Sequence, residues 1–156
     1  MKIFEDIFVS GTFAGDILSI AASIATIKKI KKNNVIKELN KLGEKLKIEL
    51  NSILENYNMF DDIKFEGNNW WPRLNVKTNR MNTNLFQTLF RQELIANGLF
   101  LGASLNLCLA HCDKTIFNST LNRFKKTAIS MKKIKDSSNP EVFLKGEKVS
   151  AVFKVR

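Results

Sequence analysis

A short loop near the start of the chain holds the residues best suited to chemistry. Residues 9–16 read Val-Ser-Gly-Thr-Phe-Ala-Gly-Asp, and a stretch rich in alanine and isoleucine follows them. Glycines let the backbone approach a ligand closely, and the free N–H groups at the start of a helix bind anions, phosphate above all. Thr12 can add a side-chain hydroxyl, so the loop is a candidate phosphate site. Ser10 and Thr12 are equally typical of ordinary turns and helix caps.

The loop does not match the common nucleotide-binding motifs. No Gly-Lys-Ser or Gly-Lys-Thr follows it, so it is not a P-loop, and its glycines do not form a GxGxxG pattern. Asp16 suits the positive start of a helix, but its charge would repel a phosphate at close range. We therefore do not predict Asp16 as a ligand.

Two further groups of residues could bind a ligand, but the sequence favours structural roles for both. Trp70, Trp71 and Arg73 could hold a ring or a carboxylate, yet we expect one indole to pack inward and the other to cover an edge. Cys108, His111 and Cys112 lack a fourth ligand for structural zinc. We predict reduced, partly buried thiols and a structural histidine there.

The periodicity of apolar residues predicts an α+β fold. The clearest signal is a stripe at steps of three and four from Val35 to Tyr57, which indicates an amphipathic helix. Together the patterns predict a small, mostly antiparallel sheet packed with helices. The expected helices span residues 16–31, 34–57, 83–97 and 114–135, and the expected strands span 63–66, 74–77, 99–101 and 105–110. Gly98 should end the third helix and Asp113 should cap the fourth. The residues expected to be buried are Leu85, Phe86, Leu89, Phe90 and Leu94 on the third helix and Ile116, Phe117, Leu121, Phe124, Ala128 and Met131 on the fourth.

Composition narrows the class of protein. The chain has 156 residues, 44% of them hydrophobic, which suits one globular domain. No apolar run is long enough to span a bilayer, no signal peptide is visible, and two cysteines make no disulfide framework, so we expect a cytoplasmic protein. The net charge of +10 is compatible with nucleic-acid binding, but the lysines are spread along the chain, so this function is not favoured.

Three stretches resemble the class-III aminotransferases, which use pyridoxal 5′-phosphate (PLP) and include the glutamate-1-semialdehyde 2,1-aminomutase group. Residues 8–26 resemble the family's Ser-Gly-Thr-Phe loop and the helix after it. Residues 98–113, with Ser104 and the pair Ala110-His111, resemble a downstream region, and residues 144–156 resemble the ending of some members. Order and spacing agree, so the resemblance covers nearly the whole chain.

The resemblance implies a fold and a site. It implies that residues 1–32 carry the phosphate loop and a connecting helix, that 33–135 form the small C-terminal domain of the type I PLP-transferase fold, and that 136–156 form an extended tail. Members are homodimers that act on substrates of the amino-acid or amino-sugar type. In them, the loop of one subunit holds the PLP phosphate bound mainly by the other, a role that would fall to Gly11, Thr12 and Ser10.

The resemblance covers only the C-terminal part of the family. The lysine that binds PLP lies a few tens of residues before the loop in members, whereas here Lys2 alone precedes it, too close to match. Met1 therefore resembles an internal methionine, and we predict no catalytic residue and no activity without a large domain. The alternatives are a free-standing, non-catalytic interaction or dimerisation domain and, less favoured, a basic nucleic-acid-binding module.

Overall fold

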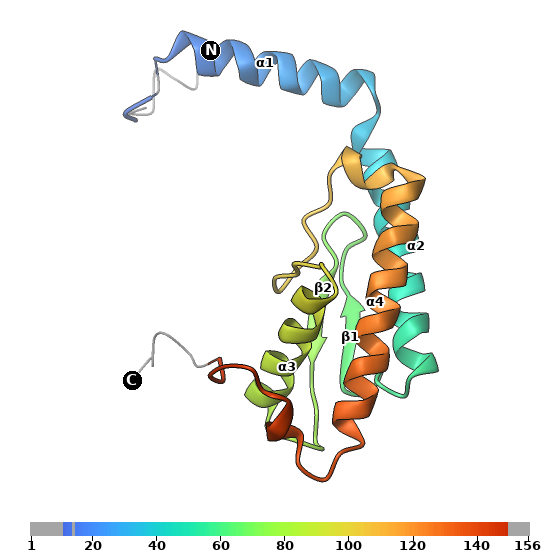
Figure 1. Ribbon diagram of the computed structural model, residues 1–156. Coiled ribbons are helices and arrows are strands. Elements are labelled where there is room, and N and C mark those ends of the chain that lie inside the picture. Colours follow the sequence, from blue (N-terminus) through green and yellow to red (C-terminus); the bar gives the residue numbers. More distant parts are fainter. Residues whose placement is uncertain (1–10, 14, 150–156) are drawn as a thin grey trace. The chain divides into compact units, whose positions relative to one another are not determined.

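The computed structural model describes residues 11–13 and 15–149 (Figure 1). The chain divides into two units, the first ending at Ile36 and the second beginning at Lys37. The first unit contains helix α1 (Ile17–Lys32), and the second contains most of helix α2 (Val35–Asn56) and everything after it. No helix within the described residues is both long enough and apolar enough to cross a bilayer.

Helix α1 begins and ends at residues that cap it. The Asp16 carboxylate accepts the N–H of Leu18, and Asn33 is the C-cap, so the prediction of a helix over 16–31 is confirmed within one residue. Lys29, Lys31 and Lys32 lie in the last turn, where positive charge suits the helix dipole. Asn34 then takes φ of 50°, a left-handed conformation that asparagine tolerates and that separates α1 from α2.

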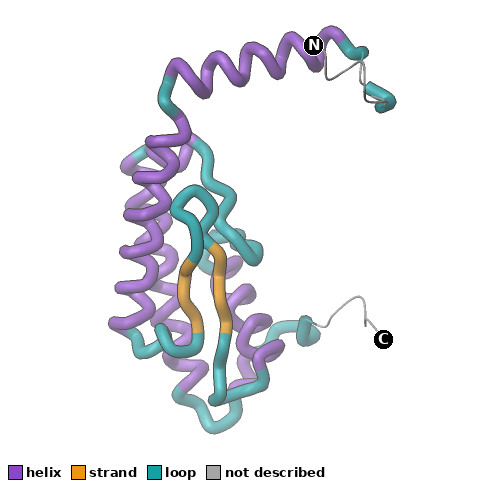
Figure 2. Tube along the Cα trace, turned by 180° about the vertical axis from the view of Figure 1, so that it is seen from behind, coloured by secondary structure: helices purple, strands orange, loops and turns teal. Residues whose placement is uncertain are grey.

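The core of the second unit lies between a β-hairpin and helices α2, α3 (Thr83–Ala96) and α4 (Lys114–Lys135). Figure 2 shows the two strands in front of these helices, so the helices cover one face of the hairpin. The three predicted helices are confirmed within one residue at each end. Phe124 of α4 meets Phe65 of the hairpin and Phe90 of α3 edge-on, with ring centroids 5.7 and 6.2 Å apart.

The hairpin pairs β1 (Ile63–Glu66) with β2 (Arg73–Val76) in antiparallel register, Ile63 opposite Val76. Ile63 and Phe65 face the core. The outer edge of β1 is closed by Asn51 of α2, whose amide accepts the Phe65 N–H and donates to the Phe65 carbonyl, both at 2.8 Å. This contact satisfies backbone groups that an edge strand otherwise leaves unpaired.

The predicted strands over 99–101 and 105–110 are wrong. The segment meets β2 through the isolated bridge of Arg73 with Ser104 and two flanking hydrogen bonds, and residues Leu109–Cys112 form a 3₁₀ turn. The alternating leucines do pack against the core, but from a loop. Alternation of apolar and polar residues indicates that one side of a segment is buried, but a strand also needs a neighbouring strand to pair with. Pro72, just before β2, has no N–H with which to extend the pairing. The fold class α+β holds, with a two-stranded sheet.

The predicted buried faces of α3 and α4 hold, with one correction on α4. Leu85, Phe86, Leu89, Phe90 and Leu94 of α3 are buried as predicted. On α4, Ile116 is exposed and not buried. The core contact of the first turn comes from its neighbour Phe117, and adjacent side chains of a helix point in directions about 100° apart. Gly98 ends α3 as predicted, with φ of 74°.

A buried ion pair joins the entry of β1 to the end of α4. The Asp62 carboxylate meets the Lys135 ammonium, and both side chains are only 6% exposed. Lys135 also donates to the carbonyl of Asn58, and the Asp62 carbonyl accepts the N–H of Lys77 at 2.8 Å. Buried charges need such partners because desolvation otherwise disfavours them strongly.

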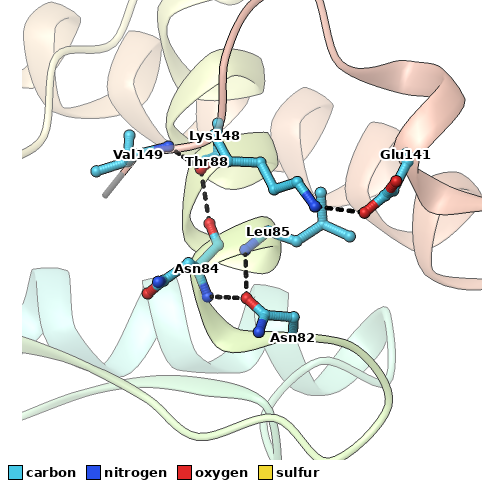
Figure 3. A network of polar contacts seen from close by, with 7 residues as sticks. All are labelled: Asn82, Asn84, Leu85, Thr88, Glu141, Lys148 and Val149. Atoms are coloured by element: carbon cyan, nitrogen blue, oxygen red, sulfur yellow. Dashed lines mark hydrogen bonds and ion pairs between the residues drawn. The ribbon is translucent and has the colours of Figure 1, made fainter. Parts of the chain in front are cut away.

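The segment after α4 is anchored to α3 and does not simply extend from it. A 3₁₀ turn spans Pro140–Phe143, and Gln92 binds the segment through the Phe143 carbonyl and the Lys145 N–H. Figure 3 shows the next contact, in which the Val149 N–H donates to the Thr88 hydroxyl at 3.0 Å. Val152, Phe153 and Val155 of the predicted tail lie outside the described residues.

Candidate functional site

The described part of the candidate phosphate loop is exposed to solvent before α1 begins. Gly11, Thr12 and Phe13 are all exposed, and the Phe13 carbonyl accepts the N–H of Asp16 at 3.1 Å. Ser10, the third predicted contact, lies outside the described residues. Thr12 therefore precedes the first residue of α1, Ile17, by five positions and is exposed to solvent.

Asp16 occupies the start of α1. Its carboxylate accepts hydrogen bonds from the Leu18 N–H and the Ser19 hydroxyl. The hydrogen bond from the Ser19 side chain is the main reason that the pKa of Asp16 lies below its ordinary value of 3.8. Because the ionised carboxylate already uses donors of the first turn, the helix start itself is a poor anion site.

The hydrogen-bond donors that could bind a phosphate lie in the loop before Asp16. Gly11 and Thr12 offer backbone N–H groups and a hydroxyl, which are the donors that phosphate oxygens accept from. Gly15 adds room, since a Cβ built there would meet nothing within 4 Å. A phosphate held by these groups would rest on the loop and avoid the charge of Asp16.

The cysteines and the histidine do not form a metal site. Within residues 11–13 and 15–149 no group of three His, Cys, Asp or Glu side chains could hold an ion. Cys108 and Cys112 are free and exposed, so the prediction of partly buried thiols is wrong. The structural role predicted for His111 is confirmed, because its Nδ1 accepts the backbone N–H of Cys108 at 3.0 Å and closes the 3₁₀ turn before α4.

The tryptophans differ from the prediction most clearly. Neither indole packs inward, since Trp70 is 56% and Trp71 47% exposed. Pro72 is buried in their place. Arg73 lies over the Trp71 ring, with its guanidinium carbon 5.7 Å from the ring centroid. The loop between the strands thus turns both aromatic side chains toward solvent.

An apolar cavity of about 500 Å³ lies under residues 99–107. Leucines of α2, phenylalanines of α4 and the loop itself line it, and His111 is its one titratable lining residue. One histidine, already bound to a backbone N–H, provides no acid–base pair. The cavity therefore offers packing space without a catalytic set.

Sequence reasoning missed the residues that hold the hairpin loop in place. The backbone of Asn69 packs against Gly43, where a Cβ would lie only 1.6 Å from the Asn69 carbonyl oxygen. Lys47 and Asn51 of α2 bind the hairpin backbone by their side chains. The available signal was a glycine within a strongly amphipathic helix, together with polar residues four apart beside its leucine stripe.

Comparison with known proteins identifies the family. The family model described as aminotransferase class-III matches residues 1–99. Glutamate-1-semialdehyde 2,1-aminomutase of Archaeoglobus fulgidus is 30% identical over 105 residues, which cover 64% of this chain and 25% of the aminomutase. The chain thus corresponds to about a quarter of that relative's length. No solved structure matches it. A match over well more than half of the chain shows that this protein belongs to the class-III aminotransferase family.

Proposed function

We propose that this chain is the C-terminal segment of a PLP-dependent aminotransferase or aminomutase that resembles glutamate-1-semialdehyde aminomutase. The family match and the aminomutase relative support this proposal. The family is generally PLP-dependent, and PLP, when bound, withdraws electrons from the amino carbon of a substrate. A substrate of the amino-acid or amino-sugar type suits that chemistry.

The loop before α1 contributes phosphate contacts in this proposal. Gly11 donates its backbone N–H, and Thr12 donates its N–H and its hydroxyl, to the phosphate of PLP bound mainly by the other subunit of a dimer. Ser10 is the third contact. Exposure of Gly11 and Thr12 is the observation that supports the assignment, since donors buried against their own chain could not reach a partner's cofactor.

The exposure of helix α1 is a second observation that supports the proposal. None of its 16 residues is buried, and Ile17 and Leu18 are 80% and 81% exposed. Apolar side chains that remain in water are typical of a surface that another protein part covers. The large domain of the same enzyme, which supplies the PLP-binding lysine in the family, is the proposed cover.

The first test is to read the DNA upstream of the codon for Met1 in all three forward frames. We expect a frame that encodes the large domain with its lysine and runs into this chain, directly or after one shift. A ribosome-binding site preceded by unrelated sequence would overturn the proposal.

The second test measures PLP affinity of the longer protein. Thr12→Val should weaken PLP binding by about tenfold, because it removes a hydrogen bond to a charged group. Thr26→Val is the matched control, since the Thr26 hydroxyl donates to the Ala22 carbonyl within α1. Equal PLP affinity in both variants would remove Thr12 from the site.

A free-standing interaction or dimerisation domain is the second candidate. The exposed apolar residues of α1 favour it as well, if a second copy covers them. Light scattering of the purified chain separates the two candidates. A monodisperse dimer at high concentration supports the interaction domain, whereas aggregation supports a segment that has lost its large domain. Nucleic-acid binding, the third candidate, predicts retention on heparin that falls steeply with salt.

A further inference from the structure

The loop between β1 and β2 exposes two tryptophans although its backbone is tightly held. Lys47 of α2 donates to the Gly67 carbonyl and to the Asn69 side-chain oxygen, both at 2.9 Å. The Asn69 carbonyl packs directly against Gly43. The backbone N–H of Trp71 donates to the Asn68 carbonyl at 3.1 Å. The exposure of the indoles is therefore built into an ordered loop.

Neighbouring residues also set the orientation of the Trp71 ring. Its indole N–H donates to the Asn106 side-chain oxygen at 3.0 Å. The backbone beneath it is fixed by Pro72, whose carbonyl accepts the Leu105 N–H at 2.8 Å. Arg73 lies over the same ring, 5.7 Å from its centroid. A ring fixed in this way binds a partner with little loss of side-chain entropy.

Arg73 is left without a carboxylate partner among the described residues. Glu66 is its cross-strand neighbour in the hairpin. The carboxylate of Glu66 instead accepts from the Asn75 amide at 2.8 Å and pairs with Lys64 at 3.4 Å. Arg73 forms no ion pair within residues 11–13 and 15–149. Its guanidinium therefore keeps donors available for an anion.

We propose that Trp70, Trp71 and Arg73 form a binding surface for a small ligand that combines a ring with an anionic group, such as a nucleoside phosphate or a sugar acid. The ring stacks on an exposed indole, as rings do on aromatic platforms. The phosphate or carboxylate accepts two N–H bonds from the Arg73 guanidinium. The net charge of +10 favours anionic ligands over neutral ones. This surface requires neither PLP nor a large domain, so its test is independent of the proposed function.

The chain itself provides the probe. Trp70 and Trp71 are its only tryptophans, so selective tryptophan fluorescence of the full chain reports on this surface alone. Uridine monophosphate and glucuronic acid are titrated at constant ionic strength, with uridine, glucose and inorganic phosphate as partial ligands. We expect saturable changes with dissociation constants of about 0.1–1 mM for one or both anionic ring ligands, and binding at least about tenfold weaker for each partial ligand.

The two anionic ligands distinguish the source of the ring. Binding of the nucleotide alone indicates stacking of a base, and binding of glucuronic acid alone indicates contact with a sugar face. Either result supports the surface. No saturable change with either ligand, or equal affinity for inorganic phosphate or for a neutral ring compound, overturns it.

Variants of Arg73 test the anionic contact. Arg73→Ala and Arg73→Lys should each weaken binding by about tenfold, because lysine keeps the charge but loses the planar pair of donors. Arg91→Ala is the control, since Arg91 is exposed on α3 and lies outside the surface. Circular dichroism confirms that each variant is folded. Unchanged affinity in both Arg73 variants would overturn the proposal.

Discussion

Helices α1 and α4 are both rich in apolar side chains, yet only α4 uses them to build a core. Helix α4 buries Phe117, Phe124, Ala128 and other residues of one face, whereas no residue of α1 is buried. Helix α1 is the less charged of the two along most of its length. Apolar composition therefore does not decide burial. Burial requires a facing surface, which α4 finds in α3 and the hairpin, and which α1 would find in the proposed large domain.

The sharpest test of this comparison truncates one apolar side chain in each helix. Phe124→Ala should reduce the free energy of unfolding by about 3–5 kcal/mol, because Phe124 is 2% exposed and touches two other rings. Ile24→Ala on α1 should change it by no more than about 0.5 kcal/mol, since Ile24 is 49% exposed. Urea denaturation measures both. A comparable loss in the two variants would show that α1 is packed in solution.

The buried ion pair tests the polar part of the same packed unit. Lys135→Met should destabilise the second unit by about 3–5 kcal/mol, because it leaves the Asp62 carboxylate buried without its partner. Asp62→Leu combined with Lys135→Met should recover much of that loss. Lys133→Met, exposed in the same turn, is the control for urea denaturation. Additive losses in the double variant would contradict a direct pair.

Gly43 tests how closely α2 approaches the hairpin loop. Alanine is normally the better helix residue, but here its Cβ would meet the Asn69 carbonyl, so Gly43→Ala should cost about 1–3 kcal/mol of stability. Gly146→Ala, where a Cβ would meet nothing within 4 Å, is the matched control. A more stable Gly43→Ala variant by thermal unfolding would show that the loop lies farther from α2.

The smallest effect concerns the start of α1 and its pH dependence. The hydrogen bond from the Ser19 hydroxyl lowers the pKa of Asp16 below its ordinary value of 3.8. The contact therefore stabilises the start of the helix fully at pH values above 3.8, and this stabilisation is lost as the pH falls through the lowered pKa. An NMR titration of the Asp16 carboxylate measures it. Ser19→Ala should return the pKa toward 3.8, whereas Ser23→Ala, whose hydroxyl binds the Ser19 carbonyl, should not. An unchanged pKa of Asp16 in Ser19→Ala would show that the Ser19 hydroxyl does not cause the lowered value.

Local sequence signals predicted most of the helical framework. Asp113 caps α4 at the predicted residue through the N–H groups of Thr115 and Ile116, and Gly98 ends α3. These features depend on residues within one turn of each other, which the sequence displays directly. The strand predictions after residue 98 failed because a strand depends on a distant neighbour. The resemblance to the family, carried by short motifs, was likewise visible without coordinates.

The candidate sites divide in the same way. The order of Gly11, Thr12 and Asp16 by itself indicates a loop that can receive an anion before a helix, since donor groups and glycine freedom are properties of the residues. The outward position of Trp70 and Trp71 depends on Gly43, Lys47 and Asn106, which lie between 23 and 36 residues away in the chain.

Sequence alone determined the helices, their caps, the family and the donors of the loop, because each depends on neighbours within a turn or on a linear motif. The tertiary structure decided which apolar faces are buried, how many strands pair, and which side of the hairpin loop carries its tryptophans. Those outcomes depend on contacts between distant segments, whose packing free energy no local pattern records.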